Sequence, residues 1–362
     1  MPAPLESWTD LGERILKETE RNNKRLKNAV LHYARLDQPK MAVTPKDVVW
    51  HRDKVELWRY RSDKRTVATP LLLVHSLVNR SYIFDLRPGN SMIEALLDRG
   101  FDVYLIDWGV PDAADARNVL ETYACDYLPE IVDEVCSIAA SKNVSMLGYC
   151  FGGVLSLLYA AANPTNRLRS LVALATPVDA NHLPESYQRA SSKTFSVDTL
   201  LDDHGNVSGE FIGSTIRALT PTADFAAKVN FFNNLWNDEF VAAHNAMTAW
   251  GNDQIPFPRE TFRQMNEMLV GGNAFMNDSV ELNGQRVSLS DITVPFLNVY
   301  GKRDHIVPYQ ATKELNSLVG SEINETLALD AGHVGLFVGR TAHRTGVPGI
   351  ADWIARYSKM VR

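Results

Sequence analysis

An α/β fold with a mostly parallel central sheet and helices on both faces is the architecture that the sequence predicts, on three observations. Short apolar runs of strand length recur at residues 70–76, 101–108, 144–149, 170–176, 294–300 and 325–330. Segments of helical character separate these runs. The runs are apolar throughout instead of alternating with polar residues, as expected for parallel strands covered on both faces.

The chain before the first run has a different pattern. Residues 11–36 are charged and helical in character, with Leu26, Val30 and Tyr33 on one narrow apolar stripe. This helix can lie on the domain surface or dock a partner. Residues 54–60 then alternate between apolar and polar side chains, which predicts a strand with one solvated face.

The segments between the apolar runs predict the covering helices. Ser91 and Gly100 bracket residues 91–99 as a possible N-cap and a terminating glycine. The remaining helices are predicted at 120–140, 151–162, around 310–319 and around 346–358.

Residues 178–290 interrupt this alternation. They are rich in Asn, Asp and Phe, with helical patches but no clear strand alternation until residues 280–289, where Asn283-Gly284 predicts a small hairpin. The stretch is expected to be a cap inserted over the strand ends. The expected organisation is therefore an N-terminal helical segment (1–45), a first core part (46–177), the cap or lid (178–290) and a second core part (291–362).

Composition excludes several classes of protein. The 362 residues carry a formal net charge of -6, which does not indicate the basic surface that binds nucleic acid. Three cysteines do not form a disulfide framework, and no His/Cys cluster has the spacing of a metal site. No secretory signal and no apolar run long enough to span a bilayer is visible. A cytoplasmic protein without a membrane span is expected.

The motif with the clearest chemistry is Gly148-Tyr149-Cys150-Phe151-Gly152, which lies directly after a predicted strand and before a predicted helix. This is the context of a nucleophile elbow, with cysteine in the place of the usual serine. Gly148 and Gly152 allow the tight turn, because any side chain there would collide with a neighbouring element. The helix N-terminus also favours a thiolate. Cys150 is therefore the candidate nucleophile, whereas Cys125 and Cys136 are expected to be structural.

A thiol nucleophile needs a base, and the base needs a group that orients it. In folds with this elbow, the acid and then the histidine follow the nucleophile along the chain. Asp304 and His333 each lie just after a predicted strand in this order. The alternatives are His305 as the base, and Asp107 or Asp179 as the acid.

The oxyanion hole in such folds takes one backbone N–H from the residue after the nucleophile, here Phe151. The second N–H is expected from Leu77 or Val78, in the loop after the strand at 70–76. His75 ends that strand and can line the oxyanion loop, or its role can be packing or a local hydrogen bond. Together these features predict an α/β-hydrolase fold with an inserted cap subdomain.

At this point the chain resembles the polyhydroxyalkanoate synthases over nearly its whole length. The matching segments are VHSLVNRSYIFDL, FDVYLIDWG, LGYCFGG, LVALATPVD, ETFRQM, PFLNVYGKRDHIVP and LDAGHVGLFVG. The length resembles that of short catalytic subunits that work with a second, non-catalytic subunit. His75 is a departure, since relatives often carry an aromatic residue there, and this leaves the fine shape of the entrance in doubt.

The resemblance implies an acyltransferase that polymerises (R)-3-hydroxyacyl-CoA, chiefly 3-hydroxybutyryl-CoA, with release of CoA. Cys150 would carry the acyl chain, His333 would be the general base and Asp304 the supporting acid. It implies no cofactor, since coenzyme A is part of the substrate and a product. It also implies a homodimer, a second subunit and a place on cytoplasmic storage granules.

Two rival functions stay open from the sequence. One is a cysteine-dependent hydrolase similar to dienelactone hydrolase, whose elbow also resembles G-Y-C-x-G-G. The other is an inactive scaffold on the granule surface. A cysteine favours the synthase chemically, because thioester exchange conserves the free energy that a stable serine ester would dissipate.

Overall fold

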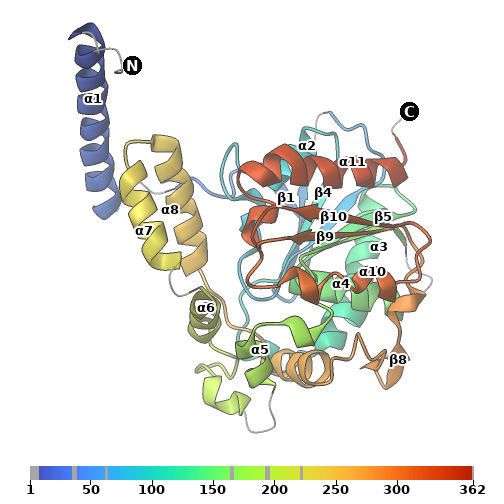
Figure 1. The fold of residues 1–362 in the computed structure, drawn as a ribbon. Helices are drawn as coiled ribbons and strands as arrows, with labels where there is room; N and C mark the ends of the chain where they lie inside the picture. The colour runs from blue at the N-terminus through green and yellow to red at the C-terminus, as the bar shows by residue number, and fades with distance from the viewer. Residues whose placement is uncertain are drawn as a thin grey trace, which may run out of the picture.

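An eight-stranded sheet organises the structure (Figure 1). The computed structural model describes residues 8–34, 39–61, 64–163, 167–191, 196–220 and 223–360. The strands are β1 (Lys46–Arg52), β2 (Val55–Tyr60), β3 (Leu71–Val74), β4 (Val103–Asp107), β5 (Val144–Tyr149), β6 (Leu168–Leu174), β9 (Phe296–Gly301) and β10 (Asn324–Leu329). They are ordered β1-β2-β4-β3-β5-β6-β9-β10, and only the pairs β1–β2 and β2–β4 are antiparallel.

Helices cover both faces of this sheet (Figure 1). Helices α3 (Leu128–Ile138), α4 (Phe151–Ala162) and α10 (Leu315–Leu318) lie on one face, and α2 (Met92–Leu97) and α11 (Val347–Tyr357) lie on the other. Successive side chains of a strand point to opposite faces. In β3, Leu72 and Val74 accordingly join the core under α3 and α4, while Leu71 and Leu73 join the core under α2 and α11. The predicted α/β-hydrolase fold is confirmed.

Several local expectations are also confirmed. The Ser91 hydroxyl accepts a hydrogen bond from the Glu94 N–H at 3.1 Å and caps α2. A hairpin of β7 (Val280–Leu282) and β8 (Gln285–Val287) turns at Asn283-Gly284, where both residues have positive φ. These features could be predicted because each depends on a short stretch of chain.

Other local expectations differ from the structure. The helix expected at 120–140 divides into a π-helical segment (Thr122–Tyr127) and α3, because Pro129 lacks an N–H and is tolerated only in the first turn of a helix. The helix expected at 310–319 is α-helical only at α10. The edge strand β1 was not predicted, since its exposed face weakens the apolar signal.

The chain between β6 and β9 holds the inserted elements. They are α5 (Glu185–Ala190), α6 (Gly209–Ala218), α7 (Ala223–Asn234), α8 (Asp238–Asn252), α9 (Arg259–Gln264) and the β7–β8 hairpin. Helices α7 and α8 form an arm beside the core together with the N-terminal helix α1 (Trp8–Tyr33) (Figure 1). The buried Asn28 side chain joins α1 to this arm, since its Nδ2 donates to the Leu235 carbonyl at 2.7 Å and to Asp238 Oδ1 at 2.8 Å.

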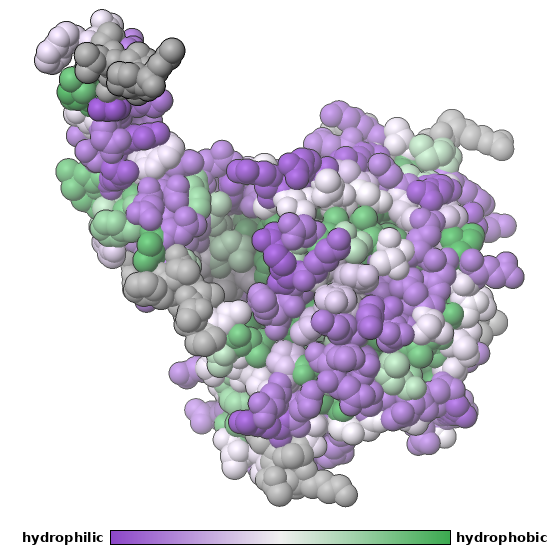
Figure 2. All heavy atoms as spheres, in the orientation of Figure 1, coloured by the Kyte–Doolittle hydropathy of each residue, from purple (hydrophilic) through white to green (hydrophobic). Residues whose placement is uncertain are grey.

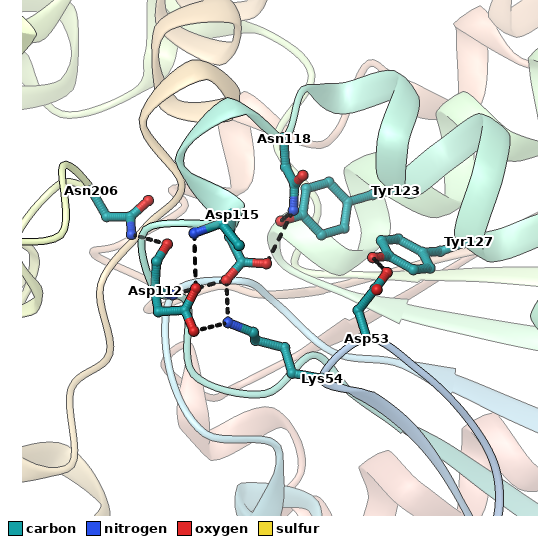
Figure 3. Close-up of polar contacts among 9 residues, drawn as sticks. Asp53, Lys54, Asp112, Asp115, Asn118, Tyr123, Tyr127 and Asn206 are labelled. Atoms are coloured by element: carbon teal, nitrogen blue, oxygen red, sulfur yellow. Dashed lines mark hydrogen bonds and ion pairs between the residues drawn. The ribbon is translucent and has the colours of Figure 1, made fainter.

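A polar cluster fastens the insertion to the core (Figure 3). Lys54, in the turn between β1 and β2, places its Nζ 2.7 Å from Asp112 Oδ2 and 2.6 Å from Asp115 Oδ2. Asn206, from the insertion, donates through Nδ2 to the Asp112 carbonyl at 2.7 Å. The hairpin turn, the loop after β4 and the insertion therefore meet at one ion-paired site.

Large apolar side chains are exposed along α1. Trp8, Leu16, Leu26, Val30 and Tyr33 have more than half of their surface accessible. Figure 2 shows apolar patches on the arm among hydrophilic side chains, whereas the visible face of the core is mainly hydrophilic. In the described part of the chain, no helix has both the length and the apolar character to cross a membrane. Residues 1–7 and 35–38 of the expected N-terminal segment lie outside the described residues.

Candidate active site

Cys150 occupies a sharp turn between β5 and α4. Its φ of 53° and ψ of -121° lie outside the regions that L-residues ordinarily adopt. This strained geometry is the one expected of a nucleophile elbow at the end of a central strand. The side chain is half-buried and reaches the cavity above the sheet.

Close packing explains the glycines on either side of the turn. A Cβ on Gly152 would overlap the carbonyl oxygens of Val74 and His75. A Cβ on Gly148 would lie 2.6 Å from the Gly153 Cα. Helix α4 therefore starts directly against the backbone at the end of β3, which brings the loop after β3 close to Cys150.

His333 and Asp304 meet at the same end of the sheet. Asp304 follows β9, and His333 follows β10. The His333 Nδ1 lies 2.7 Å from Asp304 Oδ2, and both side chains are almost wholly buried. The other carboxylate oxygen, Oδ1, accepts the backbone N–H groups of Ile306 at 2.9 Å and Val307 at 2.8 Å. The carboxylate is thus fixed in orientation and leaves one oxygen for the imidazole.

The electrostatics of His333 favour its protonated form. Burial by itself lowers the pKa of His333, but the charges of Asp304 and Cys150 and its hydrogen bonds with both raise it to about 10. The charges of the sulfur and of the carboxylate therefore act on the same imidazole. With Nδ1 bonded to Asp304, Nε2 is the nitrogen that can exchange a proton with Cys150.

The alternative acids and base have other surroundings. Asp107 accepts hydrogen bonds from the Ser81 hydroxyl and the Gly109 N–H. Asp179 accepts from the Asn181 N–H at 3.0 Å and from the Asn273 side chain at 3.0 Å. His305 is exposed. Of the candidate acids, Asp304 is the one that bonds to His333, and the charges of both Asp304 and Cys150 act on this imidazole.

The candidate oxyanion donors lie around the same cavity. Phe151 is the first residue of α4, and the N–H groups of a first helical turn have no acceptor within the helix. Val78 lines the cavity together with Cys150 and Phe151, and its N–H donates to the Ser76 hydroxyl at 3.2 Å. Leu77 is only 2% exposed and packs into the core.

A cavity of about 690 Å³ opens beside Cys150. Its walls are mostly apolar and come from the core and from the insertion, with Val154, Phe211, Phe257 and Leu269 among them. Its size is within the range of pockets that enclose small-molecule ligands.

Tyr187 also lines this cavity and was not singled out from the sequence. Burial raises the pKa of Tyr187, and the charges of Cys150 and Asp304 raise it further. A neutral phenol therefore lines the same cavity as the Cys150 sulfur. The sequence carries no signal for it, because Tyr187 is on α5 of the insertion and approaches Cys150 only through the fold.

The described residues contain no group of three His, Cys, Asp or Glu side chains that could hold a metal ion. The chemistry that these residues can perform is nucleophilic: a cysteine, an imidazole that accepts its proton and a carboxylate that orients the imidazole.

Comparisons with known proteins identify the family. Residues 69–340 match the model of the alpha/beta hydrolase fold, and residues 11–96 match the model of the poly-beta-hydroxybutyrate polymerase (PhaC) N-terminus. The poly(3-hydroxyalkanoate) polymerase subunit PhaC of Allochromatium vinosum is 37% identical, over 86% of this chain and 88% of that protein. The chain belongs to the poly(3-hydroxyalkanoate) polymerase family. Membership makes it an enzyme of the acyltransferase type.

Further relatives in this polymerase family give similar values. The PhaC subunit of Thiocystis violacea is 36% identical, over 86% of this chain and 88% of that protein. The PhaC subunit of Haloferax mediterranei is 34% identical over 87% of this chain, which spans 65% of that longer protein. Among solved structures, an esterase from Thermogutta terrifontis superposes with a TM-score of 0.53 at 15% identity, covering 87% of this chain and 100% of the esterase. At this identity, the likeness shows the fold alone.

Proposed function

We propose that the chain polymerises (R)-3-hydroxyacyl-CoA, chiefly 3-hydroxybutyryl-CoA, into polyhydroxyalkanoate through a thioester on Cys150. The observation that carries the proposal is the buried Asp304–His333 pair beside a cysteine on a strained turn that opens into an apolar cavity. His333 acts as the general base and Asp304 as its supporting acid. Coenzyme A enters as part of the substrate and leaves as a product, so the reaction needs no separate cofactor.

The first step transfers an acyl group to the enzyme. His333 Nε2 takes the proton of the Cys150 thiol, and the sulfur attacks the carbonyl carbon of the acyl-CoA thioester. The bond between that carbon and the CoA sulfur then breaks, and His333 returns its proton to the departing CoA thiolate. One thioester is exchanged for another, so the acyl group stays activated.

The second step extends the chain. His333 takes the proton of the 3-hydroxyl of another unit, whose oxygen attacks the Cys150 thioester and forms an ester. The Cys150 sulfur leaves and regains the proton. Because the charge of Cys150 is one of the causes that raise the pKa of His333, acylation of the sulfur lowers that pKa, and a larger fraction of the imidazole is then deprotonated and able to accept the proton of the 3-hydroxyl.

Stabilisation of the charge on the carbonyl oxygen requires an oxyanion hole. We assign its donors to the backbone N–H groups of Phe151 and Val78, since both residues line the cavity with Cys150, whereas Leu77 packs into the core. The Val78 N–H donates to the Ser76 hydroxyl in this structure, and on substrate binding it exchanges that acceptor for the carbonyl oxygen. The apolar cavity favours the acyl chain over water, which matters because water would release the chain as a free acid.

The assembly implied by the resemblance is a further part of this proposal. We place a second, non-catalytic subunit on the exposed apolar side chains of α1, namely Trp8, Leu16, Leu26, Val30 and Tyr33. Burial of such a surface is a common basis of protein association. A Leu26→Glu variant should weaken co-purification with the second subunit while leaving the fold intact. We also expect a homodimer and a location at the surface of cytoplasmic polyester granules.

The deciding experiment is incubation of the full chain with 3-hydroxybutyryl-CoA, followed by chromatography of CoA, free 3-hydroxybutyrate and insoluble polyester. Formation of polyester in an amount that matches the CoA released supports the proposal. Free acid in step with CoA release would identify a cysteine hydrolase instead. Absence of CoA release, together with absence of acyl-Cys150 by mass spectrometry, would identify an inactive scaffold.

A further inference from the structure

The imidazole of His75 is buried beside the active site without being one of its reacting groups. It directly follows β3, and the residue is only 1% exposed. The ring stacks on the Tyr149 ring, with centroids 6.1 Å apart and planes 17° apart, and it meets the Phe84 ring edge-on at 5.6 Å. Its Nε2 lies 3.0 Å from the Asn79 carbonyl oxygen.

Burial and the hydrogen bond together determine the charge and the tautomer of this ring. Burial lowers the pKa of His75 to about 4, so the imidazole is neutral near pH 7 and carries one N–H. A carbonyl oxygen can only accept, so the proton is on Nε2, which donates to Asn79. Nδ1 is then a buried acceptor, and it has no hydrogen-bond partner among the described residues. A buried acceptor without a partner is unfavourable. If the only role of residue 75 were packing, an apolar ring without this nitrogen would therefore stabilise the core better than histidine.

The His75–Asn79 bond closes the loop that follows β3. Within this loop the Val78 N–H donates to the Ser76 hydroxyl at 3.2 Å. At the start of the loop, Trp108 Nε1 donates to the His75 carbonyl oxygen at 2.8 Å. The loop is therefore fixed at its first residue by the backbone and at its last residue by the ring, with Val78 between them.

The same ring also contacts the nucleophile turn. Tyr149, on which it stacks, is the residue before Cys150. The carbonyl oxygens of Val74 and His75 lie where a Cβ of Gly152 would be, so α4 packs directly on the start of the loop. His75 thus joins the two segments that carry Phe151 and Val78, which line one cavity with Cys150.

We propose that His75 is a positioning residue that holds the Val78 N–H against the Cys150 turn, so that Val78 and Phe151 form one oxyanion hole. This inference rests on the proposed acyl transfer at Cys150. It assigns to His75 no contact with the substrate. Its effect is on the transition state, because an oxyanion hole acts where negative charge develops on the carbonyl oxygen.

Two variants separate the hydrogen bond from packing. His75→Phe keeps a ring against Tyr149 and loses the donor to Asn79. His75→Gln loses the ring and can keep an N–H donor in the place of Nε2. Both are compared with wild type in single-turnover acylation of Cys150 by 3-hydroxybutyryl-CoA, followed by mass spectrometry, and in alkylation of Cys150 by iodoacetamide.

For His75→Phe, the maximal acylation rate should fall at least about tenfold. Complete removal of an oxyanion donor costs about 10² to 10³ in rate, and the variant displaces the donor without removing it. The half-saturating substrate concentration should stay within about twofold, since the lost interaction exists only in the transition state. Alkylation at Cys150 should stay within about twofold, because displacement at an alkyl carbon forms no oxyanion. His75→Gln should recover most of the acylation rate.

Each other outcome overturns the inference. Equal acylation of wild type and His75→Phe would overturn the role of His75 while leaving the proposed function intact. Equal losses in acylation and alkylation, or equal defects in the Phe and Gln variants, would show that replacement of His75 disturbs the Cys150 turn in general, and would overturn the role of its hydrogen bond. Absence of acylation in the wild type would overturn the proposed function and this inference with it.

Discussion

Replacement of Asp304 by asparagine tests the proposed triad most directly, because the structure dictates how the new amide must lie. Asp304 Oδ1 accepts two backbone N–H groups, from Ile306 and Val307. In Asp304→Asn, the amide oxygen has to stay at this position, since only an oxygen can accept both hydrogen bonds. The amide NH₂ then faces His333 Nδ1, where the carboxylate oxygen lay at 2.7 Å.

This arrangement reverses the tautomer of His333. A donor opposite Nδ1 requires Nδ1 to be the bare nitrogen, so the proton moves to Nε2, which can no longer accept the proton of Cys150. The variant also loses the carboxylate charge that raises the pKa of His333. The same change in a serine protease triad costs about 10⁴ in rate, or about 5.4 kcal/mol at 1.36 kcal/mol per factor of ten. We expect a loss of about 10³ to 10⁴ in acylation of Cys150.

The assay is single-turnover acylation by 3-hydroxybutyryl-CoA, with acyl-Cys150 quantified by mass spectrometry. Asp179→Asn is the matched control, because Asp179 is also a buried carboxylate that accepts a backbone N–H, yet in the described part of the chain it forms no hydrogen bond with His333. The control should stay within about fivefold of wild type. Asp304→Asn acylation within tenfold of wild type, in a protein with an unchanged unfolding temperature, would refute the reasoning.

Three further predictions concern the nucleophile, its turn and its base. Cys150→Ala should abolish CoA release from 3-hydroxybutyryl-CoA, and Cys150→Ser should leave a small fraction of it, because a hydroxyl is a far weaker nucleophile than a thiol; comparable CoA release from either variant would contradict the role of the sulfur. Gly152→Ala should yield little folded protein, since its Cβ would overlap two carbonyl oxygens. The control Gly251→Ala has open space around the new methyl group, so its free energy of unfolding in urea titrations should stay within about 1 kcal/mol of the wild-type value. The pKa of His333 is about 10 in the folded protein against an ordinary 6.5, so the stability that its protonation contributes is complete below pH 6.5 and is lost as the pH rises to 10. The difference in unfolding temperature between wild type and His333→Gln should therefore shrink from pH 7 to pH 9.5. A difference that stays constant over this range would contradict the prediction.

Much of the fold and of the site could be predicted from short stretches of sequence. The apolar runs predict β3, β4, β5 and β6 because a strand buried on both faces needs apolar side chains at every position. The elbow around Cys150 could be predicted because a side chain at Gly148 or Gly152 would overlap the neighbouring elements. Asp304 and His333 could be selected because parallel strands end at one edge of the sheet, where their loops meet.

The features that were missed depend on distant parts of the chain. Tyr187 gained its place near Cys150 only when α5 folded over the sheet. The ion pairs of Lys54 with Asp112 and Asp115 join a hairpin turn to a loop more than fifty residues away. His75 gave two interpretations from the sequence, and the distance to the Asn79 carbonyl showed that burial and a local hydrogen bond occur together.

By itself, the sequence determined the class of fold and selected the candidate nucleophile and the order of its candidate partners, because these follow from patterns within a few residues and from strand periodicity. The tertiary structure alone decided which carboxylate orients the histidine, how each oxygen of that carboxylate is used, and which side chains of the insertion surround the sulfur. Those choices depend on distances and burial between segments far apart in the chain, and hydrogen bonds and pKa shifts exist only once such segments are packed together.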